Sequence, residues 1–150
     1  MRVVIQRVSE AAVCVDGKIT GQINHGLLVL AGFEASDLTT DLEWMARKVI
    51  GLRIFADKNG GMNQSVLDTS GQILAVSQFT LYGSTKKGNR PSWSRAARGD
   101  ISQPLFEHFV ELLSIALGQP IQTGIFGADM QVSLVNDGPV TLTIDSKEPE

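Results

Sequence analysis

The chain has 150 residues, of which 43% are hydrophobic and 19% are charged, and its formal net charge is −3. This length predicts one domain, residues 1–150, that buries enough surface to fold without disulfides or metals. The acidic balance argues against indiscriminate nucleic-acid binding, although an average can hide a local basic patch. One cysteine cannot form an internal disulfide, and no Cys/His set has metal-ligand spacing, so we expect no metal and no cofactor.

The N-terminal segment predicts strands rather than a targeting signal. Its apolar run is far too short for a signal peptide or a membrane span, so we expect a cytoplasmic protein with no membrane partner. Alternating residues predict a strand over residues 2–15, and the turn signal Asp16-Gly17 leads into a second strand over residues 18–23. The apolar run 27–31 predicts a third strand that is buried on both faces. Arg7 is a charge at an apolar strand position, where arginine usually extends from a sheet edge and less often clamps a carboxylate or backbone carbonyls.

A first helix is predicted after these strands. Ser36 is its expected N-cap, and Asp37 lies in the first turn, where an acidic side chain is favoured. Four apolar residues at helical spacing are expected to form its buried face: Leu38, Leu42, Met45 and Val49.

A core strand and a basic segment follow. The apolar run 73–79 predicts a strand that continues into Thr80-Leu81-Tyr82. Five of the chain's 13 basic groups then fall close together, with Trp93 among them: Lys86, Lys87, Arg90, Arg95 and Arg98. No acidic residue separates them. Such a run is as often a solvated face as it is a phosphate-binding patch, so both interpretations stay open here.

A second helix is predicted to begin near Asp100 or Ser102, with Pro104 in its first turn and Gly118 as its stop. Its buried stripe is expected to contain Leu105, Phe109, Leu112 and Ala116. Together with about seven strands, these elements predict an α+β fold: a mostly antiparallel, curled or barrel-like sheet with two main helices in a single domain.

The segment Asn136-Asp137-Gly138-Pro139 interrupts the C-terminal strands. Residues 130–135 and 140–144 alternate apolar and polar side chains, whereas proline cannot donate to a sheet ladder and glycine weakens a strand interior. The segment is therefore either an ordinary hairpin turn or a sharp bend that places backbone where it is needed. A cis Gly138–Pro139 bond is compatible with both, but only about 5–6% of such bonds in folded proteins are cis.

The usual catalytic constellations are missing from the sequence. There is no Gly-rich phosphate loop, no nucleophile elbow and no pair of metal-spaced histidines. Thr80 is a candidate nucleophile, yet threonine needs an activating base or an N-terminal amine, and no base is evident nearby. The residues by themselves thus predict an α+β domain with an unusual Gly-Pro bend and a basic loop.

Two separated motifs, Ser77-Gln78-Phe79-Thr80-Leu81 and Asn136–Thr141, resemble those of the D-aminoacyl-tRNA deacylase family. The resemblance covers nearly the whole chain, from residues 2–8 through Arg90-Pro91-Ser92-Trp93 to residues 123–130. It implies a homodimeric hydrolase, with its site at the subunit interface, that cleaves the ester of D-amino acids and of misplaced glycine on tRNA. By rejecting L-aminoacyl-tRNA, such an enzyme carries out chiral proofreading in translation.

The resemblance also implies roles for the first motif. The backbone amides of Phe79 and Thr80 would hold the substrate, with Ser77 and Gln78 orienting the site. The attacking water would be assisted by the 2′-OH of the terminal adenosine of the tRNA. An aminoacyl ester is already reactive, so positioning and oxyanion stabilisation can supply most of the acceleration.

The second motif and its neighbours receive roles in the same way. The Gly138–Pro139 bond is expected to be cis and to project its carbonyls into the partner subunit's pocket. Arg7 is expected to hold this motif in place. Phe126 and Met130 are expected to line the pocket, although plain core packing would explain them equally well.

Two alternatives from other classes stay open. One is a non-catalytic tRNA-binding module that uses the basic loop, in which Lys86 and Lys87 are the expected phosphate contacts. The other is a threonine-nucleophile esterase, which would depend entirely on Thr80 and form a covalent acyl-enzyme.

Overall fold

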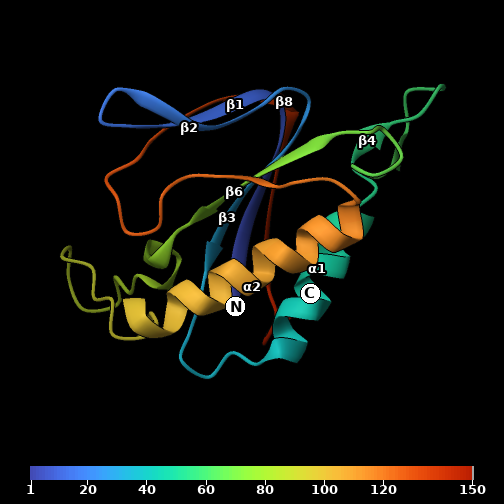
Figure 1. Ribbon diagram of the computed structural model, residues 1–150. Coiled ribbons are helices and arrows are strands. Elements are labelled where there is room, and N and C mark those ends of the chain that lie inside the picture. Colours follow the sequence, from blue (N-terminus) through green and yellow to red (C-terminus); the bar gives the residue numbers. More distant parts are fainter. Residues whose placement is uncertain (150) are drawn as a thin grey trace.

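A curled, mixed sheet with two helices packed against one face makes up the fold (Figure 1). The computed structural model describes residues 1–149. The main sheet contains β1 (Arg2–Val15), β2 (Lys18–Ile23), β3 (Gly26–Gly32), β6 (Gln72–Ser77), β7 (Gln122–Thr123) and β8 (Gln131–Asp145). A separate hairpin contains β4 (Phe55–Ala56) and β5 (Met62–Gln64). This arrangement confirms the predicted α+β fold with a barrel-like sheet and two main helices.

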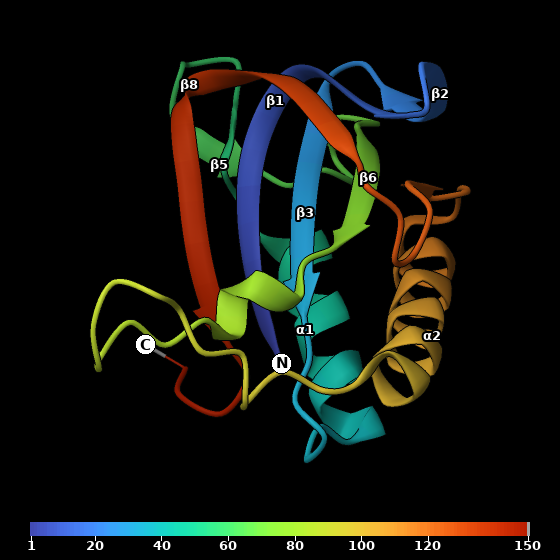
Figure 2. The same cartoon turned by 90° about the vertical axis from the view of Figure 1, so that its left-hand side faces the viewer.

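Most strand pairings are antiparallel. In the order β2-β1-β3-β6-β7, only the β3–β6 and β6–β7 pairings are parallel. β8 runs antiparallel along the other edge of β1 (Figure 2). The β1–β2 hairpin turns where the sequence predicts, and the φ angles of Asp16 and Gly17, 49° and 77°, are those that a two-residue hairpin turn needs.

β8 decides between the two interpretations of the Gly-Pro segment. Residues 131–136 pair with residues 8–14 of β1, and residues 141–145 pair with residues 2–6, so both halves follow the same partner strand. The segment is therefore a bend within one strand, and the interpretation as a hairpin turn is wrong. The Gly138–Pro139 bond is cis, as the resemblance implies.

The first helix, α1 (Thr39–Gly51), has Leu38 as its N-cap, so the prediction of Ser36 is wrong. Asp37 lies outside the helix, where its fully buried carboxylate accepts a hydrogen bond from the Met1 ammonium at 2.6 Å. Because the helix starts later, Leu38 is 64% exposed and does not join the core. The other predicted positions are buried: Leu42, Met45 and Val49.

The second helix, α2 (Gly99–Leu117), buries a different stripe from the predicted one. Its buried apolar residues are Phe106, Phe109, Leu113 and Leu117, and of the predicted set only Phe109 is among them. Both stripes consist of apolar residues three or four positions apart, so helical periodicity alone cannot separate them. Phe33 decides between them, because its ring centroid lies 6.4 Å from those of both Phe106 and Phe109. Gly118 ends the helix with a φ of 73°, as predicted.

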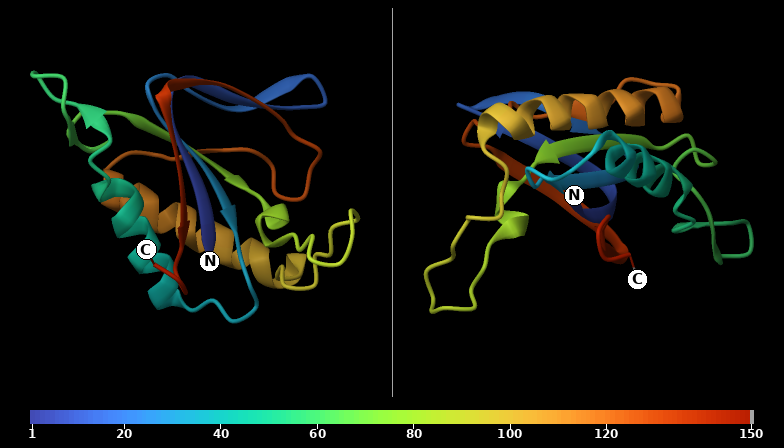
Figure 3. Two further views of the ribbon diagram at one scale, coloured as in Figure 1. Left: turned by 180° about the vertical axis from the view of Figure 1, so that it is seen from behind. Right: turned by 90° about the horizontal axis from the view of Figure 1, so that it is seen from below.

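The two helices lie side by side against the sheet and close the main core (Figure 3). A smaller core, which includes Val13, Leu28 and Leu74, fills the space between the β1–β2 hairpin and β6. Within residues 1–149, no helix is both long and apolar enough to cross a membrane.

Candidate functional site

A tight helical turn follows β6. The sequence predicts a strand up to Tyr82, but β6 ends at Ser77 and the chain enters the 3₁₀ helix η1 (Phe79–Tyr82). The Gln78 N–H still donates to the Ala31 carbonyl at 2.7 Å, which is the last bond of the parallel ladder. Gly32 lets the chain turn here, because a Cβ at that position would come within 2.7 Å of the Gln78 carbonyl oxygen. The end of β3 therefore sets the end of β6.

The turn leaves two adjacent backbone donors unused. The N–H groups of Phe79 and Thr80 are the first of η1, where a 3₁₀ helix provides no acceptor within itself. Within residues 1–149, neither group donates to a backbone carbonyl. The Thr80 side chain is fixed separately, since its Oγ1 accepts a hydrogen bond from Nε2 of Gln78. Two neighbouring N–H groups of this kind suit the stabilisation of an oxyanion.

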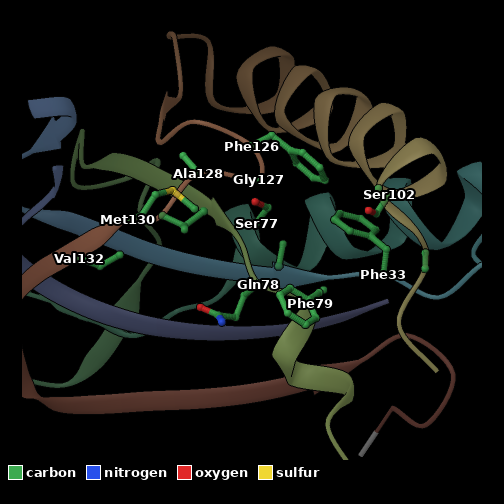
Figure 4. Close-up of a pocket in the computed structure, with 15 residues that line it drawn as sticks. Phe33, Ser77, Gln78, Phe79, Ser102, Phe126, Gly127, Ala128, Met130 and Val132 are labelled. Atoms are coloured by element: carbon green, nitrogen blue, oxygen red, sulfur yellow. The ribbon is translucent and has the colours of Figure 1, made fainter. Parts of the chain in front are cut away.

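A cavity of about 520 Å³ lies beside this turn (Figure 4). It is bounded by the ends of β3 and β6, the start of α2 and the loop that precedes β8. Five of the expected site residues line it: Ser77, Gln78, Phe79, Phe126 and Met130. Phe126 also packs on the main core, with its ring centroid 6.2 Å from that of Phe106, so the cavity and core interpretations both hold for it.

Sequence reasoning missed several walls of this cavity. Phe33 enters from the end of β3, Ser102 from the first turns of α2, and Val132 from the start of β8. Each of these follows an ordinary apolar or helical pattern, so the sequence carries no local signal that would have identified them.

Arg7, on β1, holds the Gly138–Pro139 bend in place. Nε of Arg7 lies 3.1 Å from the carbonyl oxygen of Asp137 and 3.3 Å from its carboxylate, and Nη1 donates to the carbonyl of Ile54 at 2.5 Å. The Arg7 side chain is only 13% exposed. Arg7 therefore makes the contacts of a clamp, which is the less usual of the two interpretations that its strand position allows.

The bend does not line the cavity of its own chain. Arg2, at the start of β1, donates to the Leu81 carbonyl of η1 at 3.3 Å, whereas Arg7 contacts the bend. The two arginines are five residues apart on β1, which corresponds to about 17 Å. The structure thus brings Ser77, Gln78 and Phe79 together with Phe126 and Met130 around the cavity. Thr80, Gly138, Pro139 and Arg7 do not line it.

Arg2 and Arg95 fix the far end of η1, and sequence reasoning missed this role. Their guanidinium carbons lie 4.7 and 5.6 Å from the ring centroid of buried Tyr82. Burial raises the pKa of the Tyr82 hydroxyl, and the carboxylates of Asp37 and Glu34 raise it further, so this phenol stays neutral. The contacts of Arg2 join positions about 80 residues apart, which no sequence spacing reveals.

The basic segment divides into two parts. In the second part, Arg95 pairs with Glu34 at 2.5 Å, which ties the segment to the chain just after β3, and Arg98 forms a local pair with Asp100 at 3.4 Å. Residues 84–92 form a projecting loop closed by an antiparallel bridge between Ser84 and Ser92 (Figure 3). Three of its side chains are exposed and form no ion pair within residues 1–149: Lys86, Lys87 and Arg90.

No group of three or more His, Cys, Asp or Glu side chains in residues 1–149 is placed to hold a metal ion.

Known proteins resemble the chain over its full length. The sequence model of the D-Tyr-tRNA(Tyr) deacylase family matches residues 4–145. D-aminoacyl-tRNA deacylases of Dechloromonas aromatica (strain RCB) and Chromobacterium violaceum are 70% and 61% identical, and each alignment covers 100% of both chains. A solved structure, that of a c-Myc DNA unwinding element binding protein, is 39% identical, has a TM-score of 0.91 and covers 97% of this chain and 98% of its own. A second, described as a probable eukaryotic D-amino acid tRNA deacylase, is 20% identical with a TM-score of 0.81 and shows the same fold.

Proposed function

The chain belongs to the D-Tyr-tRNA(Tyr) deacylase family, and on this basis we propose that it hydrolyses the ester bond that joins a D-amino acid to the 3′ end of tRNA. The observation that carries the proposal is the cavity of about 520 Å³ that Phe79 lines, at the start of the turn whose first two N–H groups, those of Phe79 and Thr80, have no backbone acceptor in residues 1–149. A cavity of this size suits a small ligand such as an aminoacyl group. The protein acts in the cytoplasm, as a chiral proofreading step in translation.

The two N–H groups donate to the carbonyl oxygen of the ester. When water attacks, negative charge gathers on that oxygen, and donors that are already in place stabilise it without reorganisation. Each donor of this kind is typically worth about 10²–10³ in kcat. The 2′-OH of the terminal adenosine assists the attacking water, and the 3′ oxygen leaves with a proton as the ester C–O bond breaks. Ser77 and Gln78 orient the site from the end of β6.

Thr80 acts through its backbone rather than through its hydroxyl. Its Oγ1 accepts a hydrogen bond from the Gln78 amide, and an amide is not a base that could activate a nucleophile. We therefore expect Thr80→Ala and Thr80→Val to keep more than about a tenth of the wild-type kcat on D-tyrosyl-tRNA, a smaller loss than that of one oxyanion donor. Loss of all activity, with an acyl-threonine adduct in the mass spectrum of the wild type, would instead support a threonine-nucleophile esterase.

We propose further that the site is completed by a second copy of the chain in a homodimer. The Gly138–Pro139 tip is exposed, and neither residue of the tip lines the cavity of its own chain. In a dimer with two-fold symmetry each tip enters the cavity of the partner, so both sites are completed at once. There the backbone carbonyls of the tip occupy the space into which the side chain of an L-amino acid would project from Cα. Such a wall rejects L-amino acids and admits D-amino acids and glycine.

Deacylation of matched D- and L-tyrosyl-tRNA tests the function. We expect the D-form to be hydrolysed at least about a thousandfold faster, which corresponds to about 4 kcal/mol of discrimination. Equal rates for D- and L-tyrosyl-tRNA would contradict the proposed selection of D-amino acids. Binding of tRNA without deacylation of either form would support the non-catalytic tRNA-binding module.

Lys86 and Lys87 contact tRNA phosphates in this proposal. Each neutralised phosphate adds about 0.7–0.9 to the slope of log K against log salt concentration. We therefore expect the double alanine variant to bind tRNA more weakly and to lose about 1.5 from this slope, measured by filter binding. A double alanine variant at Lys18 and Lys58, two exposed lysines elsewhere, serves as the control. An unchanged slope in the first variant would mean that the loop is only a solvated face.

A further inference from the structure

Two exposed aromatic rings form a pair at the edge of the cavity. Phe79, the first residue of η1, is 55% exposed, and Trp93, from the end of the basic loop, is 41% exposed. Their ring centroids are 5.4 Å apart, and the planes meet at 75°, which is the favoured edge-to-face geometry of aromatic rings. Phe79 also lines the cavity, so the pair extends from the cavity toward the loop.

The backbone builds this pair. The bridge between Ser84 and Ser92, with N–H···O distances of 2.8 and 2.9 Å, returns the chain to η1 immediately before Trp93. Gly83 provides the space for the indole, because a Cβ at this position would lie 2.6 Å from Cζ3 of Trp93. The position of the indole thus depends on the Ser84–Ser92 bridge and on Gly83. An incidental surface contact between two rings would require neither.

The surroundings of the pair favour an anionic partner with flat apolar groups. Lys86, Lys87 and Arg90 project from the same loop, and no aspartate or glutamate occurs between Asp68 and Asp100. Exposed aromatic rings beside a cationic groove are the features that bind single-stranded nucleic acid, since each base stacks on a ring while the cations follow the backbone. A protein partner would not need this combination.

We propose that Phe79 and Trp93 form a stacking platform for the unpaired nucleotides next to the esterified adenosine at the 3′ end of tRNA. This inference rests on the proposed function, which places the aminoacyl group in the cavity beside Phe79. The single-stranded 3′ end of the tRNA then leaves the cavity over Phe79, and the base next to the terminal adenosine stacks on Trp93. The cationic side chains of the loop bind the phosphates. Stacking tolerates any base, so the platform holds the 3′ end of every tRNA alike.

Two substrates distinguish the contribution of the stacking platform to kcat/KM from that of the catalytic site. D-tyrosyl-tRNA carries the neighbouring nucleotides, whereas 3′-D-tyrosyl-adenosine ends at the cavity. We expect Trp93→Ala to lower kcat/KM for the tRNA substrate by about 5- to 150-fold, the range of one base–aromatic stack, and to leave that for the adenosine ester within about twofold. Trp93→Phe keeps a stacking ring and should retain most of the activity on the tRNA.

Ile115→Ala is the matched control, because Ile115 is 72% exposed on α2. This substitution should leave kcat/KM unchanged for both substrates. An equal loss on both substrates would mean that Trp93 only supports η1, and no loss on the tRNA substrate would mean that no base stacks there. Either result overturns the platform. The adenosine ester also reports whether the Trp93→Ala variant is folded, since it depends on the cavity alone.

A binding measurement tests the stacking platform independently of catalysis. In a Trp44→Phe background, Trp93 is the only tryptophan, and we expect its fluorescence to be quenched by the trinucleotide CCA. Unchanged fluorescence at millimolar CCA would overturn the platform. Failure of the wild type to cleave either ester would overturn the proposed function, and the quenching result would still decide whether the platform binds single-stranded RNA.

Discussion

Arg7→Ala is expected to lower kcat/KM for D-tyrosyl-tRNA by at least about a hundredfold. The substitution removes the contacts with the carbonyl groups of Asp137 and Ile54, and hydrogen bonds to a charged group are worth about 1.5–3 kcal/mol each. Without them the Gly138–Pro139 tip loses its support. Arg47→Ala, an exposed arginine on α1, is the control for the loss of one positive charge.

Mixing subunits shows whether the tip acts in the same chain or in the partner. Phe79→Pro removes the Phe79 ring and one N–H donor at the first position of η1, a position at which proline is tolerated, and should lower kcat by at least about 10²–10³, the effect of losing one donor. Arg7→Ala and Phe79→Pro subunits, refolded together at equal concentration, should regain about a quarter of the wild-type activity. Half of the dimers are then mixed, and each of these has one intact site of two. No recovery, in a mixture shown to contain mixed dimers, would place tip and cavity in the same chain.

Glycyl-tRNA should be hydrolysed at a rate within about tenfold of that of D-alanyl-tRNA, while L-alanyl-tRNA should be slower by more than about a thousandfold. L-alanine differs from glycine by one methyl group. Attraction of a single methyl or methylene group in a pocket is worth about 1–3 kcal/mol, or about 10- to 200-fold. A larger ratio therefore requires that the site excludes the methyl, as a wall of backbone carbonyls does. The three esters should be compared on the same tRNA.

Gly138→Ala tests where that wall lies. Gly138 has a φ of 126°, which strains any L side chain, and an added Cβ would lie 2.6 Å from Nη2 of Arg7, so the substitution must displace the tip or the guanidinium that holds it. We expect the ratio of glycyl to L-alanyl hydrolysis to fall by at least about tenfold. An unchanged ratio in a dimer with a displaced tip would show that another part of the cavity excludes the L side chain.

The sequence by itself determined the features that depend on neighbouring residues. The Asp16-Gly17 turn, the stop of α2 at Gly118 and the buried run of β3 are all where local patterns predict them. Each depends on the backbone preference of one or two residues or on the alternation of a short segment. The motif at residues 77–81 likewise identified the segment beside which the cavity lies.

Only the tertiary structure decided how these segments meet. α1 has its N-cap at Leu38 rather than Ser36, and the Met1 ammonium binds Asp37 just outside the helix. The buried stripe of α2 contains Phe106, which contacts Phe33, the residue after β3. β6 ends early because η1 turns across Gly32. In each case a contact between residues that are far apart in the sequence outweighs a local preference, which amounts to less than about 1 kcal/mol per residue.

The same reason explains what the sequence could not show about the site. Residues 77–79, Phe126 and Met130 come from segments about 50 residues apart, and they share one cavity because β6 and the loop before β8 end at the same side of the sheet. The separation of the Gly138–Pro139 tip from this cavity follows from the register of β8 on β1. Register is fixed by which faces are buried across the whole sheet, and no local pattern contains that information.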